Sequence, residues 1–262
     1  MKHLRIHFSV LLLVLVAFTA CKSGDDDGGG ATDPKAENLK ALGTSAEDIL
    51  SDDIYQSLTI EIVYSDTFRP QEATLNNLRN FLSERVNKPG GVQIVETQIP
   101  LPGTAPYVTN EIRDIEDDVR TKYTSGDDIA IFVFFADGNA QTDTETTLTL
   151  GTAYRNTSIV IYERTLQEIG ASPQTPDRTT LETTTLLHEF GHLLGLVNIQ
   201  NDDIHTDHED PLNAKHCVVE ECLMYFQTEL TREQLNRQMR NMLDIPVLDP
   251  LCVGDLQAKG GK

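Results

Sequence analysis

Two histidines and a glutamate within five residues give this sequence its strongest chemical signal. The segment reads His188-Glu189-Phe190-Gly191-His192, so two imidazoles stand four residues apart. On an α-helix this spacing puts both rings on one face, where they can share one zinc ion. Glu189 lies roughly 100° further round the helix, where its carboxylate can accept a proton from a zinc-bound water. The motif predicts His188 and His192 as zinc ligands and Glu189 as the general base.

The residues around the motif predict the helix that must carry it. Apolar residues recur at i, i+3 and i+4 on the side opposite the two imidazoles: Leu186, Phe190, Leu193, Leu194 and Val197. We expect this helix over residues 178–195, with Thr179 and Glu182 as a capping box and Gly195 at its end. One face of the helix then packs into a core while the other presents the ligands.

The segments before this helix alternate between strand and helix patterns. Strands are expected over 58–64, 92–99 and 129–135, with helices over 71–86 and 108–123 between them. Two more strands, over 148–152 and 158–162, are expected around a turn at 154–156. Residues 129–135 are nearly all apolar, which is typical of a central strand buried on both faces. This order predicts an α/β (α+β) fold with one mixed, twisted sheet. After residue 195 we expect a loop over 198–222 and a last helix over 231–243.

Residues 1–20 have the pattern of a signal peptide. A basic start precedes an apolar run from Phe8 to Ala20, which is too short to span a bilayer as a mature helix. The run ends in Phe18-Thr19-Ala20-Cys21, which resembles the lipobox of bacterial lipoproteins, where the Cys is acylated. Residues 21–35 are polar and Gly-rich, as in a flexible tether, and their acidic cluster resembles the surface-export signal of Bacteroidetes lipoproteins. These resemblances imply an exported protein anchored to the outer membrane only by a lipid on Cys21, with cell-surface exposure as a further expectation.

The rest of the chain, residues 36–262, is expected to be a single domain. The chain carries 41 acidic and 21 basic residues, for a formal charge of −20. Such a charge repels phosphate backbones, so nucleic acid is excluded as a partner. We expect a monomer whose partner is a peptide or protein substrate.

Residues 188–226 resemble the metzincin clan of zinc metallopeptidases. Those proteins carry H-E-x-x-H-x-x-G-x-x-H/D followed by a turn that contains a methionine. Leu223-Met224-Tyr225 supplies such a Met-turn, and Cys217-x4-Cys222-x-Met224 is similar to the archaemetzincin spacing. The resemblance implies a metzincin-like fold, with an N-terminal half over 36–195 and a small irregular C-terminal half over 196–262. It also implies that the strand near 148–152 or 158–162 is an edge strand that binds an extended peptide.

The third zinc ligand departs from that motif, because Asn198 stands where the clan has His or Asp. An amide oxygen is a poor zinc ligand beside two imidazoles. The following loop offers other donors: His205, Asp207, His208 and His216. We favour His208, because the acidic residues that follow it can hold its ring through hydrogen bonds. His216 is the next choice and Asn198, or a carboxylate, the last. The predicted metal ligands are therefore His188, His192 and His208.

Three cysteines remain if Cys21 is lipidated: Cys217, Cys222 and Cys252. Because an exported compartment permits disulfides, we expect a Cys217–Cys222 bridge. A pairing that involves Cys252 and a second metal site built from the three cysteines are the alternatives.

Together these patterns predict a zinc-dependent endopeptidase with Zn2+ as its cofactor. Glu189 would take a proton from the zinc-bound water, the hydroxide would attack a peptide carbonyl, and Glu189 would pass the proton to the leaving amine. Tyr225 could stabilise the oxyanion by resemblance, although some metzincins place that tyrosine where this chain has Phe226. The alternative is a non-catalytic surface binding or adhesion lipoprotein that retains the fold. Asn198 favours this alternative, whereas Glu189 argues against it, since a structural zinc site needs no general base.

Overall fold

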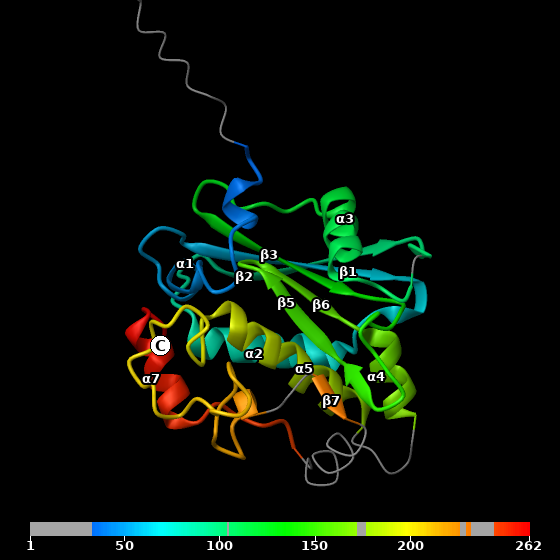
Figure 1. Ribbon diagram of the computed structural model, residues 1–262. Helices are drawn as coiled ribbons and strands as arrows, with labels where there is room; N and C mark the ends of the chain where they lie inside the picture. The colour runs from blue at the N-terminus through cyan, green and yellow to red at the C-terminus, as the bar shows by residue number, and fades with distance from the viewer. Residues whose placement is uncertain (1–32, 104, 172–176, 226–228, 232–243) are drawn as a thin grey trace, which may run out of the picture. The chain divides into compact units, whose positions relative to one another are not determined.

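The computed structural model describes residues 33–103, 105–171, 177–225, 229–231 and 244–262 (Figure 1). These residues belong to one compact unit, Asp33–Lys262. The expected signal peptide, most of the tether and residues 232–243 of the expected last helix lie outside the described residues. Within the described part of the chain, every helix is too short or too polar to cross a bilayer.

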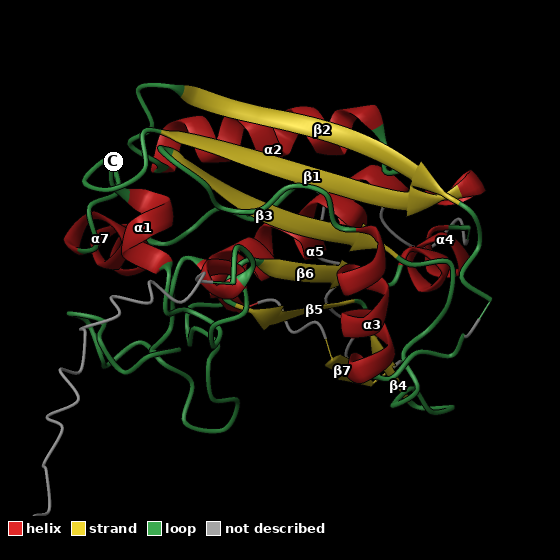
Figure 2. Cartoon of the chain, turned by 90° about the horizontal axis from the view of Figure 1, so that it is seen from above, coloured by secondary structure: helices red, strands yellow, loops and turns green. Residues whose placement is uncertain are grey.

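A five-stranded sheet forms the centre of this unit. Its strand order is β2-β1-β3-β6-β5, as Figure 2 shows. The strands are β1 (Ser57–Ser65), β2 (Gly91–Ile99), β3 (Asp128–Phe135), β5 (Gly151–Arg155) and β6 (Ser158–Ile161). The first four strands in this order run parallel, whereas β5 is antiparallel to β6 and forms one edge. The predicted mixed α/β sheet is confirmed.

Helices cover both faces of the sheet (Figure 1). The helix α2 (Glu72–Arg85) links β1 to β2 and packs against α5 (Arg178–Leu193), and α5 also contacts β5 and β6. The helix α3 (Thr109–Val119) links β2 to β3 and lies on the opposite face. The remaining elements are η1 (Ala36–Asn38), α1 (Ala46–Leu50), η2 (Asp66–Phe68), β4 (Thr147–Thr149), α4 (Glu163–Gly170), η3 (Leu223–Tyr225), β7 (Glu229–Thr231) and α7 (Pro250–Ala258).

The alternation of side chains along β3 explains this layered arrangement. Ile129, Ile131, Val133 and Phe135 join the core cluster that contains the apolar side chains of α2 and α5. Phe132 and Phe134 point the other way and join the cluster that contains Ile112 of α3. Because a strand alternates its side chains between two faces, a run without polar residues fits only a strand covered on both sides. The expectation of a central buried strand is confirmed.

The strand expected over 148–152 is split in two. The first part is β4, which pairs with β7 in a separate two-stranded sheet, and the second is β5, which includes Tyr154 and Arg155. The turn lies at residues 156–157 instead of 154–156, and Asn156 has a structural role in it. Its buried amide donates to the Glu37 carbonyl and to the Ser45 hydroxyl, both 2.8 Å away. Of the two strands proposed for the sheet edge, β6 is interior and β5 is the edge.

Two helix boundaries also differ from the predictions. The helix α3 ends at Val119 rather than near residue 123, because the Arg120 side chain turns inward and donates to the carbonyl of Ala130 at 2.8 Å. The N-cap of α5 is Asp177, whose carboxylate accepts the N–H of Thr180 at 3.1 Å. The predicted capping box is therefore wrong: Glu182 is buried and accepts the N–H of Gln71 at 2.7 Å.

Candidate metal centre

The helix α5 brings the two motif histidines and the glutamate together. The imidazole centroids of His188 and His192 lie 4.7 Å apart, with the ring planes nearly perpendicular. His188 is fully buried, and Glu189 and His192 are almost so. The i, i+4 spacing therefore produces the shared face that the sequence predicts.

A third imidazole reaches this face from the loop after the helix, and it belongs to His216. Its ring centroid lies 5.2 Å from that of His188, nearly stacked on it, and 5.6 Å from that of His192. One nitrogen of each ring lies within 4.8 Å of the others. Three imidazoles are a common protein ligand set for zinc.

Burial sets the protonation of the two helix imidazoles. It lowers the pKa of His188 well below its usual value, and it lowers the pKa of His192 to about 3. Both rings are therefore neutral, which is the form that binds metals. Nδ1 of His188 lies 3.0 Å from the carbonyl oxygen of Leu223. When that nitrogen carries the proton and donates it, the lone pair is on Nε2, which can then bind the metal.

The structure brings His216, and not His208, to the helix histidines. Nε2 of His208 lies 3.0 Å from Asp255 Oδ2, and its Nδ1 lies 3.5 Å from the sulfur of Cys217, in a second group of donors. Asn198 instead supports the loop, since its amide donates to Glu209 at 3.1 Å. We expected His208 to complete the site of His188 and His192, but the structure places His216 there instead.

Backbone pairing around Met224 explains why His216 arrives at this point. The N–H of Cys217 donates to the Met224 carbonyl at 3.0 Å, so the residue before Cys217 is held beside the Met-turn. The sequence held one signal for this, the direct adjacency of His216 to the first cysteine of the Cys217-x4-Cys222-x-Met224 pattern. The 20 residues between Gly195 and His216 form a long loop. The spacing of the motif does not predict which residue of this loop returns to the helix.

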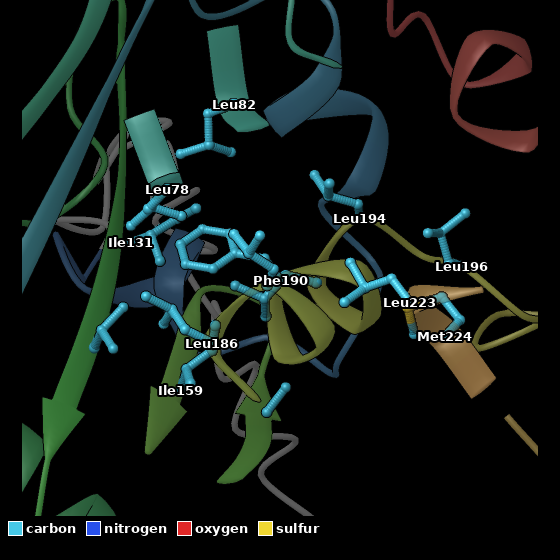
Figure 3. Close-up of a cluster of buried hydrophobic side chains, with 14 of the residues drawn as sticks. Leu78, Leu82, Ile131, Ile159, Leu186, Phe190, Leu194, Leu196, Leu223 and Met224 are labelled. Atoms are coloured by element: carbon cyan, nitrogen blue, oxygen red, sulfur yellow. The ribbon is translucent and has the colours of Figure 1, made fainter. Parts of the chain in front are cut away.

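The Met-turn packs directly under the motif helix. A Cβ atom built on Gly191 would overlap the sulfur of Met224, so a larger residue at this position would displace the methionine side chain. Figure 3 shows Leu223 and Met224 beside the end of α5, next to Leu194 and Leu196. The small residue inside the motif therefore allows the close approach of the turn that positions His188 and His216.

The edge strand β5 holds the Glu189 carboxylate in place. Oε2 of Glu189 accepts the N–H of Ala153 at 2.8 Å. A Cβ atom on Gly151 would lie 2.9 Å from Cγ of Glu189 and 3.0 Å from Cγ2 of Thr185. The absence of a side chain at Gly151 thus leaves room for the carboxylate.

An open cleft of about 400 Å³ leads to these groups. Its walls are the edge strand and the loop before His216, and it is lined by Leu42, Gly151, Thr152, Ala153, Glu189, His192, Ile199, Asn213, Ala214, Lys215 and His216. Tyr225 is not among these residues; it is half-buried and packs against the large core cluster. Phe226 lies outside the described residues.

The second donor group consists of His208, Cys217, Asp249 and Cys252, with one donor atom of each within 4.8 Å of the others. The sulfur of Cys217 lies 3.2 Å from Asp249 Oδ2, and the sulfurs of Cys222 and Cys252 lie 3.7 Å apart. All three cysteines are buried free thiols. The expected Cys217–Cys222 disulfide is therefore wrong, because these side chains converge with Cys252 on α7 instead of pairing with each other.

The surroundings of these sulfurs suit a metal ion. Cys217 and Cys222 each accept a backbone N–H from two residues further on, Val219 and Met224, at 3.4 Å. Hydrogen bonds from the other two thiols lower the pKa of Cys217, which favours the thiolate. Sulfur, imidazole and carboxylate are the donors that zinc prefers, so this group can hold a structural ion beneath the Met-turn.

Comparisons with known proteins add one structural likeness. No family model and no curated protein matches the chain. Among solved structures, the chain is similar to archaemetzincin from Methanopyrus kandleri, with a TM-score of 0.48 and 19% identity over 78% of this chain and 96% of that chain.

Proposed function

We propose that this protein is a zinc-dependent endopeptidase. The observation that carries the proposal is the convergence of His188, His192 and His216 at an open cleft, with the Glu189 carboxylate beside them. Catalytic zinc sites have three protein ligands and an open position, whereas structural sites close with four. A carboxylate beside three imidazoles at an open cleft fits the first kind of site.

The residues of the chain divide the chemical work. A zinc ion held by the three imidazoles would supply Lewis acidity, which acidifies water and polarises a carbonyl. Glu189 would accept the proton from the attacking water and then deliver it to the leaving amine. Ala153 and Gly151 would fix the carboxylate, one by its N–H and the other by leaving room for it.

The substrate would be an extended peptide on the free edge of β5. Within the described residues, no strand pairs with the outer side of β5. An exposed strand edge offers backbone donors and acceptors to a peptide, which can add itself as a further strand. The cleft lies between this edge and the loop at 213–216, so the peptide bond would lie against Glu189.

Zinc content and peptide cleavage, measured together, test this function. We expect the purified protein to bind zinc and to cleave an unfolded protein such as casein, with activity removed by a chelator and restored by zinc. Glu189→Gln should retain the zinc and lose activity by a factor on the order of 10²–10⁴. The exposed Glu47, changed to Gln, is the matched control and should behave as wild type.

Either of two results would contradict the proposal. One is cleavage at the wild-type rate by Glu189→Gln. The other is a zinc-loaded protein that cleaves no peptide in a degenerate library, which would favour a non-catalytic binding lipoprotein.

We also propose that the protein is exported and anchored by a lipid on Cys21. The support lies in the sequence alone: a basic start, an apolar run and small residues before that cysteine.

A further inference from the structure

A second hollow lies next to the cleft, at the other end of the same edge strand. Its volume is about 370 Å³, and it is lined by Leu39, Lys40, Ala41, Arg113, Tyr154 and Arg155. Three of these six side chains are cationic and none is acidic. In a chain with 41 acidic and 21 basic residues, this composition runs against the overall charge.

The hollow and the cleft share two walls. Along β5, Gly151 to Ala153 line the cleft, and the next two residues, Tyr154 and Arg155, line the hollow. Along the N-terminal segment, Leu42 lines the cleft and residues 39–41 line the hollow. The two spaces are therefore consecutive stretches of one path along the sheet edge.

Arg113 is the cation of this hollow that lacks a counter-ion. Arg155 contacts Glu116 at 2.8 Å and Asp117 at 3.1 Å, and Lys40 contacts Glu37 at 2.5 Å. Arg113, in contrast, forms no ion pair with any carboxylate of the described residues.

The hydrogen bonds of Arg113 are also few and long. Within the described part of the chain, its guanidinium donates only to Asn110 Oδ1 and to the Tyr154 carbonyl, each at 3.4 Å. Its buried Nε has no hydrogen-bond partner among the same residues. A guanidinium with spare donors is suited to a carboxylate, which it can bind with two parallel hydrogen bonds.

We infer that this hollow is a subsite for a carboxylate of the bound peptide, an inference that rests on the proposed peptidase function. A strand advances about 3.3 Å per residue, so Arg155 lies roughly 7 Å along β5 from Ala153, where Glu189 is held. The residue that reaches the hollow is therefore two or three positions from the scissile bond. An Asp or Glu side chain there, or the C-terminal carboxylate of a short peptide, meets Arg113.

The negative charge of the whole protein limits the preference for an acidic residue to the subsite position. A chain of charge −20 repels an acidic peptide as a whole. A single acidic residue at the subsite position is favoured, whereas acidic residues elsewhere in the peptide weaken binding. This pattern separates the subsite from a general attraction between opposite charges.

A matched peptide series tests the subsite. Quenched fluorescent peptides differ only by Glu or Gln at the second or third position on either side of the cleaved bond, each with a free or an amidated C-terminus. We expect Glu at one position to raise kcat/KM about tenfold, mainly through KM, because a hydrogen bond to a charged group is worth about that factor. Dependence on the free C-terminus instead of Glu would assign the subsite to the end of the peptide.

Substitutions in the hollow identify the residue responsible. Arg113→Gln should remove the preference for Glu, so that the Glu and Gln peptides are cleaved at equal rates, and Arg113→Glu should make the Gln peptide the better substrate. Arg79→Gln on the exposed face of α2 is the control and should keep the preference. A wild-type enzyme that cleaves the Glu and Gln peptides equally at every position, with free and amidated C-termini alike, overturns the subsite and leaves the peptidase intact.

Peptide binding separates the two proposals if nothing is cleaved. Fluorescence anisotropy reports affinity without turnover. Tighter binding of the Glu peptide, lost in Arg113→Gln, would support the subsite while the absence of cleavage contradicts the peptidase. Equal binding of the Glu and Gln peptides, with free and amidated C-termini alike, would overturn the subsite.

Discussion

The backbone N–H of Ala153 donates to Oε2 of Glu189 at 2.8 Å, although the two residues are 36 positions apart. One lies on the antiparallel edge strand and the other on the motif helix. The strand that would receive the peptide is thus the same strand that orients the proposed general base. A shift of this strand would therefore move both the bound peptide and the Glu189 carboxylate.

Gly151→Ala should impair catalysis while leaving metal binding intact. A Cβ atom there would lie 2.9 Å from Cγ of Glu189, so the glutamate side chain must shift. Misplacing a catalytic group by about 1 Å can cost on the order of 100-fold in rate, so we expect kcat to fall by that factor with unchanged zinc content. Glu47→Gln, the exposed control used above, should retain turnover. A Gly151→Ala enzyme with wild-type kcat would contradict the positioning role.

Substitution of the loop histidines should separate the two metal groups. His216→Ala should lose activity and one zinc per chain, because it removes one of three imidazoles at the cleft. His208→Ala should weaken metal binding in the cysteine group and lower the melting temperature while the remaining zinc still supports cleavage. Metal analysis of both variants beside wild type, with two ions expected per wild-type chain, makes the comparison. If His208→Ala abolished activity and His216→Ala did not, His208 would be the third ligand of the catalytic zinc, as the sequence predicts.

A buried pair of carboxyl groups should make stability depend on pH. Glu163 and Glu182 are fully buried on either side of Arg178, which lies 2.5 Å and 3.3 Å from them. Burial, together with the nearby charge of Glu182, raises the pKa of Glu163 from 4.5 to about 9. The folded protein therefore keeps a proton that the unfolded chain releases above pH 4.5. The stability that this group contributes is complete below that pH and is lost as the pH rises through about 9.

Denaturant unfolding across this pH range checks the effect. We expect the free energy of unfolding of wild type to fall as the pH rises, and Glu163→Gln to reduce that fall by on the order of 1–3 kcal/mol. Glu168→Gln, on the exposed side of the same helix, is the matched control. If the free energy of unfolding fell equally with pH in wild type and in Glu163→Gln, Glu163 would not keep a proton in the folded protein.

Cys21→Ser should release the protein from membranes. If Cys21 carries a lipid, wild type partitions with the membrane fraction, whereas the variant accumulates as a soluble or unprocessed form. Mass spectrometry of the wild-type N-terminus provides the direct reading. Wild-type protein recovered from the medium with an unmodified Cys21 would refute the anchor.

The sequence by itself determined the features that follow from local periodicity. The spacing of His188 and His192 puts both rings on one helix face whatever surrounds the helix, because 3.6 residues make a turn. The uninterrupted apolar run of β3 required cover on both faces, and the helices α2 and α3 supply it. The order β1-α2-β2-α3-β3 was therefore readable from the chain, whereas the short helices α1 and α4 were not predicted.

Tertiary structure alone decided the features that depend on long-range pairing. His216 joins the helix histidines through the backbone bond from Cys217 to Met224, and no repeating pattern records the path of a 20-residue loop. Asp249 and Cys252 reach His208 and Cys217 only because α7 packs beneath the Met-turn, more than 30 residues later in the chain. A ligand set needs only that side chains meet in space, and sequence distance places almost no limit on which residues of a loop can do so.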